Sequence, residues 1–410
     1  MIGADQREKP TKGSTTMTNV VSDLPPEGDA VVPFRVSIPQ ADVDDLKSRI
    51  AATRWPGRQT VNDWGQGVPL ERAKALVEAW RDSYDWRAFE ARLNAFPQFR
   101  TRIDGLGFHF IHVKSRHSNA LPVIMTHGWP GSIIEFLDVI SPLTDPTAYG
   151  GRAEDAFDVV IPSLPGFGFS DQPAEVGWDI LRTANAWAVL MDRLGYKRWV
   201  AQGGDLGAAV TTVLAKIRPP GLVAAHVNWP LVVPETLQVN PSAKEQAAFD
   251  ARQHYFDNYG GYFKEQSIRP QTLGYGLADT PAGQAAWLYD FLHQLPEHRG
   301  DEDTLPVRAM LDDISLYWFT NSSASSARYY WENFRIPAGP AFNAGTVDLP
   351  MAASIFPGEI YVPPKAWAEA LWSKLYYWNE VDRGGHFAAW EQPDLFVAEL
   401  RKAFQSIREA

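Results

Sequence analysis

The strongest constraint on the fold comes from three short apolar runs, each followed by a glycine-containing loop and then by a helix-like segment. The runs are Leu121–Met125, Phe157–Ile161 and Trp199–Ala201. A strand that is apolar on both faces needs cover on both faces, and a parallel sheet between two layers of helices provides it. The alternation of such strands with helices therefore predicts an α/β fold with a mostly parallel sheet.

The pattern changes on both sides of this alternation. Upstream, two amphipathic helices and a pair of strands around an Asp104-Gly105 turn are expected. Downstream, the alternation stops near residue 217, a long helical segment rich in aromatic residues follows, and strand-like runs return at 352–356 and 375–381. The predicted parts, in chain order, are a disordered tail (1–30), an N-terminal meander (31–115), the first part of the α/β core (116–217), a helical cap (218–345) and the second part of the core (346–410).

The turn after the third run carries the most informative motif. Residues 203–207 read Gly-Gly-Asp-Leu-Gly, with Asp205 at the centre and small residues two positions before and after it. This pattern is typical of a nucleophile elbow, a sharp turn that presents a reactive side chain between a strand and a helix. A carboxylate there needs no activating base and can displace directly at a saturated carbon to give an ester. The pentapeptide alone is equally typical of a tight turn with an aspartate N-cap, so residues elsewhere in the chain are needed to choose between an elbow and a structural turn.

Two further polar residues follow predicted strands in the same way. Glu359 comes after the run at 352–356, and His386 lies in a Gly-Gly-His-Phe loop after the run at 375–381. The order Asp205, Glu359, His386 is the nucleophile–acid–base order of α/β-hydrolases. Each residue lies where a parallel sheet places its ligands, at the carboxyl ends of strands. The three together favour a catalytic triad over three unrelated loop residues.

A loop after the first run, His127-Gly128-Trp129-Pro130, supplies a candidate oxyanion hole. Loops of this type direct a backbone N–H toward the nucleophile, so we expect the amides of Trp129 and Leu206 to stabilise an oxyanion. The side chain of His127 is expected to be structural.

Composition excludes several classes of function. The chain has no cysteine, which removes disulfides, thiolate catalysis and zinc–thiolate sites. Its net charge is 38 − 49 = −11 without a basic patch, so nucleic acid is not an expected partner. No apolar run reaches the ~18 residues of a membrane span and no signal peptide is seen, so we expect a cytoplasmic protein. His109 and His112 lie in a predicted strand, where this spacing points them to opposite faces, so metal binding is not expected.

With these residues in place, the chain resembles the epoxide hydrolases of the α/β-hydrolase fold, and in particular the microsomal and juvenile-hormone branch. The resemblance rests on the segments around Trp129, Asp205 and His386, on a Pro-Gly-Phe-Gly-Phe-Ser loop at 165–170, and on the N-terminal segment with Arg54-Trp55-Pro56. It covers the chain from about residue 31 to the end. The microsomal relatives have a membrane anchor, which we do not expect in this chain, so it resembles their soluble bacterial counterparts.

The resemblance implies two cap tyrosines that donate hydrogen bonds to the epoxide oxygen. They match Tyr262 and Tyr330. Neither can be chosen by physical argument alone: Tyr329 competes with Tyr330, and Tyr255 or Tyr259 competes with Tyr262. The branch usually has tryptophan after the nucleophile, whereas this chain has Leu206. The backbone N–H is independent of that side chain, but the shape of the pocket is not.

The resemblance therefore implies an epoxide hydrolase that needs no cofactor and no metal, and that converts an epoxide and water to a vicinal diol through an ester on Asp205. The aromatic cap suggests a bulky or aromatic epoxide as substrate, and the reaction would serve detoxification or natural-product biosynthesis. The sequence does not decide whether the protein forms a homodimer. The alternatives are a haloalkane or haloacid dehalogenase of the same fold and a non-catalytic ligand-binding protein. A dehalogenase commonly holds halide with an indole N–H after the nucleophile, which Leu206 cannot supply. A complete triad argues against a non-catalytic protein.

Overall fold

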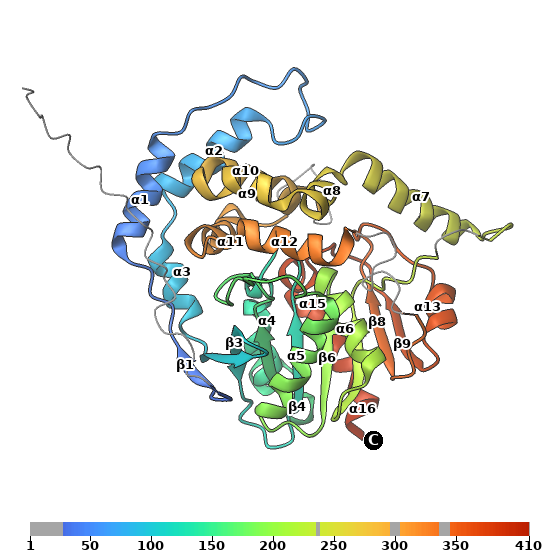
Figure 1. Ribbon diagram of the computed structural model, residues 1–410. Coiled ribbons are helices and arrows are strands. Elements are labelled where there is room, and N and C mark those ends of the chain that lie inside the picture. The colour runs from blue at the N-terminus through green and yellow to red at the C-terminus, as the bar shows by residue number, and fades with distance from the viewer. Residues whose placement is uncertain (1–27, 235–237, 296–303, 336–344, 410) are drawn as a thin grey trace, which may run out of the picture.

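A sheet of nine strands forms the centre of the computed structural model, which describes residues 28–234, 238–295, 304–335 and 345–409 (Figure 1). The strand order is β1-β2-β3-β5-β4-β6-β7-β8-β9. Pairs from β1 to β5 along this order are antiparallel, and those from β5 to β9 are parallel. The strands are β1 Val32–Phe34, β2 Gln98–Ile103, β3 Leu106–Val113, β4 Leu121–Thr126, β5 Phe157–Pro162, β6 Trp199–Gly203, β7 Leu222–Val227, β8 Met351–Ile355 and β9 Leu375–Glu380.

The apolar runs form the middle of this sheet, as the sequence predicts. Val123 of β4, Val159 of β5 and Val200 of β6 are completely buried, because helices cover both faces of the sheet. Helices α5 and α6 pack against each other on one face, and α4 and α15 do so on the other (Figure 1). The mostly parallel sheet and the α/β-hydrolase architecture are confirmed. The helices of the core are α4 Leu137–Thr144, α5 Ile180–Arg193, α6 Asp205–Ile217, α13 Lys365–Leu371, α14 Ala388–Glu391, α15 Pro393–Ala403 and α16 Gln405–Glu409.

Strand β7 lies within residues 218–345, where a helical cap is predicted, so this part of the prediction is wrong. The strand pairs parallel with β6 on one side and with β8 on the other, so it belongs to the sheet. Its signal in the sequence is weak, since Leu-Val-Ala-Ala-His-Val has small residues and a histidine where a buried strand usually has large β-branched side chains. The imidazole of His226 is accommodated by a hydrogen-bond contact of 3.0 Å with the Ser354 hydroxyl of β8. The core therefore continues to the end of β7.

Helices α7–α12, which follow β7 in the described part of the chain, lie above the sheet and form the cap (Figure 1). The N-terminal helices flank it: α1 and α2 contact α10, and α3 contacts α11. Polar contacts join these parts, among them a buried one from Trp80 Nε1 to Ser315 Oγ at 2.8 Å and a partly buried one from the Tyr84 hydroxyl to Asp312 at 2.8 Å. These helices are α1 Gln40–Ala51, α2 Leu70–Asp82, α3 Trp86–Leu93, α7 Ala243–Asn258, α8 Gly261–Ile268, α9 Pro270–Asp279, α10 Pro281–Gln294, α11 Val307–Phe319 and α12 Ser323–Phe334.

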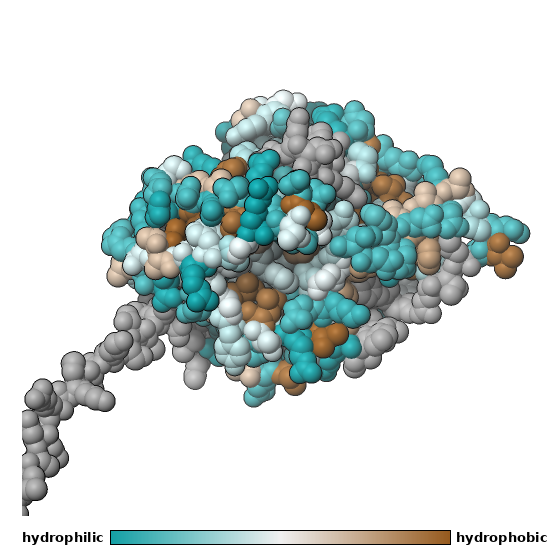
Figure 2. Space-filling model, turned by 90° about the horizontal axis from the view of Figure 1, so that it is seen from above, coloured by the Kyte–Doolittle hydropathy of each residue, from teal (hydrophilic) through white to brown (hydrophobic). Residues whose placement is uncertain are grey.

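The face above the cap is mostly hydrophilic, with hydrophobic residues in small separate groups (Figure 2). None of the helices in the described ranges is long and apolar enough to cross a membrane. The tail predicted at 1–30 lies almost wholly outside the described residues, which begin at Gly28.

Candidate active site

The elbow predicted at Asp205 is present between β6 and α6. Asp205 has a backbone φ of +48°, a left-handed conformation that non-glycine residues seldom adopt and that is common at functional turns. The helix packs closely against the end of β4 at this point: a Cβ on Gly207 would lie 1.8 Å from the carbonyl oxygen of Thr126. Glycine at 207 therefore lets α6 approach the sheet while Asp205 is held above its edge.

Backbone contacts between two loops bring Glu359 and His386 together. The N–H of Gly358, after β8, donates to the carbonyl of Gly384, after β9, at 2.9 Å. The histidine loop is fixed further by Glu391, whose carboxylate accepts hydrogen bonds from the amides of Gly385 and Phe387 at 3.0 and 2.8 Å. The two side chains are thus positioned by backbone geometry.

The predicted triad residues lie in contact in the expected order. His386 Nδ1 lies 2.6 Å from Glu359 Oε1, and its Nε2 lies 3.3 Å from Asp205 Oδ2. The Nε2–Oδ2 contact is close but not aligned as a hydrogen bond. The His386 and Glu359 side chains are each 1% exposed, whereas Asp205 is 16% exposed. The nucleophile candidate is accordingly the member of the three that a ligand can reach.

The charge state of His386 is governed by these two carboxylates. Burial lowers the pKa of the imidazole, but the negative charge of Glu359, the hydrogen bond with Glu359 and the negative charge of Asp205 act in the opposite direction and prevail. The pKa of His386 is therefore raised well above its usual value. Part of this increase comes from the charge of Asp205, so forming an ester on Asp205 removes that part and lets His386 act as a base.

This coupling gives the first prediction. An adjacent carboxylate favours the imidazolium, so replacing Asp205 by asparagine should lower the pKa of His386, and Glu359→Gln should lower it further. Titration of the His386 imidazole by NMR in the wild type and both variants checks this. A pKa that is unchanged or higher in Asp205→Asn would show that the two groups are not electrostatically coupled.

The loop after β4 directs one amide at Asp205. The Trp129 N–H donates to Asp205 Oδ1 at 2.9 Å. Gly128 makes this approach possible, because a Cβ there would lie 2.2 Å from the same oxygen. The amide of Leu206, the other predicted donor, lies in the first turn of α6 beside Asp205. His127 is held by the Gly128 carbonyl and the Leu164 amide, and burial lowers its pKa to about 4, as expected of a neutral structural histidine.

Of the competing tyrosines, Tyr262 and Tyr330 lie over Trp129. The Trp129 ring stacks on Tyr262 at 5.0 Å between centroids and meets Tyr330 edge-on at 5.9 Å. Tyr329 faces away, with its hydroxyl bonded to Thr183 of α5 at 2.9 Å, and Tyr259 is 43% exposed. Tyr255 is also buried, and its hydroxyl lies 3.3 Å from that of Tyr262.

Both cap phenols are held in the protonated form. Burial raises the pKa of Tyr262, and the charge of Asp205 raises it further. The pKa of Tyr330 is raised mainly by burial, and further by Tyr262 and by the charge of Asp205. Both rings contact Trp129, whose amide donates to the Asp205 carboxylate. Both can therefore act as hydrogen-bond donors there.

Three functional neighbours were not singled out from the sequence. Glu391 fixes the histidine loop, Trp229 lies with its ring centroid 5.5 Å from that of His386, and Glu135 lines a small cavity beside Asp205. Only Glu391 left a usable signal, since a carboxylate shortly after a Gly-Gly-His-Phe loop can accept its amides. The other two are brought to the site by tertiary contacts.

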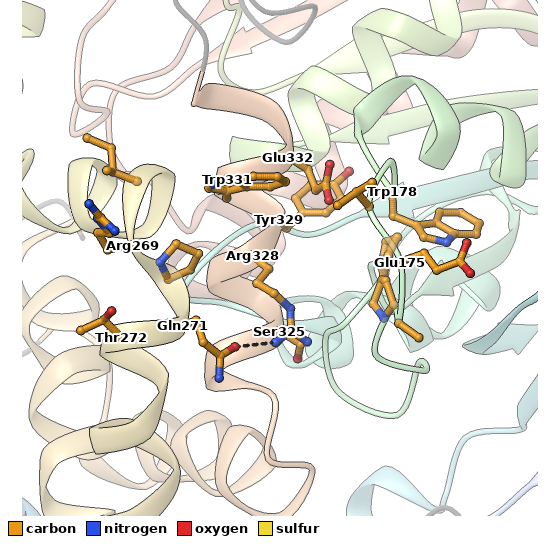
Figure 3. A pocket seen from close by; sticks show the side chains of 16 residues that line it. Glu175, Trp178, Arg269, Gln271, Thr272, Ser325, Arg328, Tyr329, Trp331 and Glu332 are labelled. Carbon is orange, nitrogen blue, oxygen red and sulfur yellow. Dashed lines mark hydrogen bonds between the residues drawn. The ribbon is translucent and has the colours of Figure 1, made fainter.

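A much larger cavity, about 640 Å³, lies elsewhere (Figure 3). It is bounded by the 173–178 loop, α9 and the face of α12 that carries Arg328, Tyr329 and Glu332. None of the predicted site residues lines it, because Tyr330 belongs to the opposite face of α12. Its position on the far side of that helix separates it from the triad.

The histidine pair in β3 is engaged by protein groups. His109 contacts Ser163 and Gln98, and His112 contacts the Tyr196 hydroxyl at 2.8 Å. Within the described ranges, no group of three or more histidine, aspartate or glutamate side chains is arranged to hold a metal ion.

Comparisons with known proteins agree with this geometry. The family model "Epoxide hydrolase N terminus" matches residues 31–136, and the alpha/beta hydrolase fold model matches 122–271. A Stigmatella aurantiaca protein named "Putative epoxide hydrolase" is 57% identical, over 92% of this chain and 86% of its own. Epoxide hydrolase 1 of Sus scrofa is 32% identical, over 92% and 89%. The crystal structure of juvenile hormone epoxide hydrolase from Bombyx mori is 26% identical and superimposes with a TM-score of 0.83, over 93% and 96%.

Proposed function

This chain belongs to the epoxide hydrolases of the α/β-hydrolase fold, and we propose that it opens its epoxide by attack of the Asp205 carboxylate. One observation carries the proposal: a single partly exposed carboxylate on a strained turn contacts His386 Nε2 at 3.3 Å and the Trp129 amide at 2.9 Å. The comparisons do not favour the dehalogenase alternative, and the Leu206 side chain has no donor for a halide.

In the first half-reaction, a carboxylate oxygen of Asp205 attacks one epoxide carbon in line with the C–O bond that breaks. The ring oxygen then carries developing negative charge. Tyr262 and Tyr330 donate hydrogen bonds to that oxygen, which is a poor leaving group without donors. Ring strain assists the step, and the product is an alkyl ester of Asp205.

In the second half-reaction, water attacks the carboxyl carbon of that ester. His386 accepts the proton of the water through Nε2, while Glu359 on Nδ1 maintains the tautomer and stabilises the cation that forms. The amides of Trp129 and Leu206 stabilise the oxyanion. The bond between this carbon and the alkyl oxygen then breaks, the protons return to the two alkoxide oxygens, and a vicinal diol leaves.

The substrate is a small-molecule epoxide, and we infer that it is bulky or aromatic. Aromatic rings pack around Trp129 and the cap tyrosines: Phe291 packs against both Trp129 and Tyr262, and Phe263 packs against Tyr330. Such a lining binds apolar and aryl groups better than small polar ones. Assembly as a homodimer and a cytoplasmic location stay predictions from the sequence.

The source of the product oxygen tests the covalent route. With wild-type enzyme in H₂¹⁸O and substrate in deficit, the first diol should contain an unlabelled oxygen, because the oxygen that bonds to carbon comes from Asp205. Label should enter the carboxylate and appear in the diol only in later turnovers. Mass spectrometry of the diol from single and multiple turnovers distinguishes the route through an Asp205 ester from direct attack by water. Full labelling of the first diol would mean direct attack by water.

A further inference from the structure

A cavity of about 10 Å³ adjoins the triad, and its lining includes neither of the cap tyrosines. This is on the order of the space that one water molecule requires. Asp205, His386, Trp129, Asn228 and Glu135 are among the residues that line it. Attack on the carboxyl carbon of an Asp205 ester requires a water within reach of both that carbon and His386, and this cavity borders both residues.

Glu135 is the one ionisable group in its lining to which the half-reactions above give no role. It lies in the 3₁₀ helix Ile133–Phe136, directly after the oxyanion loop. The residue retains partial exposure, whereas its Oε1 is buried and has no hydrogen-bond partner in the part of the chain that the structure describes. A buried carboxyl oxygen without a partner is costly unless a ligand or water uses the group.

Gly131 makes room for this carboxyl group. A Cβ at that position would lie 1.7 Å from Glu135 Oε1, so any other residue would displace the Glu135 side chain. The glycine in this loop therefore leaves space for a carboxyl group beside Asp205. The Gly131 carbonyl is held in turn by the Tyr317 hydroxyl at 2.9 Å.

The surroundings of Glu135 favour its neutral form. Burial raises the pKa of Glu135 to about 8; the charges of Asp313 and Asp205 act in the same direction, while His386 and the Gly128 amide oppose them. A neutral carboxyl group has both a donor and an acceptor, so it can orient a water without adding a second negative charge beside the nucleophile.

We propose that the Glu135 carboxyl group is a positioning residue that holds the hydrolytic water between His386 Nε2 and the carboxyl carbon of the Asp205 ester. The proposal rests on the proposed function. In this step the water oxygen bonds to the ester carbon, its proton moves to His386, and the bond from that carbon to the alkyl oxygen breaks. The alkyl oxygen then takes the proton from His386. Glu135 exchanges no atom; it fixes the direction of attack.

The test uses Glu135→Leu, which removes the polar group at similar size, and Glu135→Gln, which keeps a donor and an acceptor. In Glu135→Leu, ester hydrolysis should slow by roughly tenfold to a hundredfold, while alkylation stays within about threefold of wild type. Glu135→Gln should restore most of the lost rate. Stopped-flow tryptophan fluorescence in single turnover, with intact-protein mass spectrometry of the ester, measures the two rates separately.

Two further variants separate positioning from general damage. Glu399→Gln changes a buried carboxylate that accepts from Ser354 and Tyr377 behind the sheet, so it should lower stability and leave the ratio of the two rates unchanged. Gly131→Ala, which displaces the carboxyl group while keeping it, should slow hydrolysis selectively, even if Glu135→Leu does not fold.

Equal slowing of both half-reactions, no slowing of hydrolysis in Glu135→Leu, or a Glu135→Gln variant as slow as Glu135→Leu would each overturn the role of Glu135. Failure of the proposed function would look different, because the wild type itself would then form no ester.

Discussion

Replacing His386 by glutamine should give a protein that reacts once with its substrate and then stops. Attack by Asp205 requires no general base, whereas hydrolysis of the ester requires His386 to accept a proton from water. Glutamine is similar in size and cannot act as that base. Turnover should therefore fall by roughly 10²- to 10⁴-fold or more, the contribution usual for a general base. The ester should accumulate.

Intact-protein mass spectrometry detects the ester directly. The added mass should equal one complete epoxide molecule, because opening the ring releases no atom, whereas a dehalogenase would lose halide as its adduct forms. Asp205→Ala should give no adduct. Glu359→Gln should show a weaker form of the same block, since it disturbs the tautomer and leaves the base in place. A His386→Gln variant that turns over normally, or that never gains the epoxide mass while the wild type is active, would contradict the assignment of nucleophile and base.

The polar centre of the site could be predicted because strand ends in a parallel sheet converge. Asp205, Glu359 and His386 are far apart in the chain, but each follows a strand of the same sheet, so their spacing in sequence did not matter. The elbow could be predicted because close backbone contacts require glycine at its positions, as at Gly207. A local pattern of this kind can be recognised in a single sequence.

Features that depend on tertiary packing were not readable in this way. Strand β7 was missed because its small residues resemble those of a buried helix. The choice of Tyr262 over Tyr255 depends on how the cap helices lie on the sheet, which no local pattern encodes. Glu135 is recognised only once Gly131 and the cavity beside Asp205 are seen together. Its sequence position alone, four residues beyond Gly131, gives no sign that the carboxyl group turns toward the triad.

The largest effect expected from the cap is that of removing both tyrosine hydroxyls. If Tyr262 and Tyr330 share the epoxide oxygen, each single change to phenylalanine leaves one donor, and the alkylation rate should fall by about 10²-fold or less. With both changed, the developing alkoxide has no donor in a site from which water is largely excluded. The loss of a comparable oxyanion donor costs ~2.7–4 kcal/mol, so the double variant should lose roughly 10⁴-fold or more.

Tyr329→Phe and Tyr255→Phe are the matched controls for this series. Tyr329 lies on the other face of α12 with its hydroxyl on Thr183, so its loss should leave the alkylation rate near that of wild type. Tyr255 contacts Tyr262 at 3.3 Å, so its change should have an effect smaller than that of Tyr262→Phe. Single-turnover alkylation rates order the five variants, because hydrolysis of the ester does not involve these hydroxyls. If the Tyr262→Phe/Tyr330→Phe double variant alkylates as fast as the wild type, the donors to the epoxide oxygen are other groups. The indole N–H of Trp229, near His386 and without a hydrogen-bond partner among the described residues, is then the first candidate.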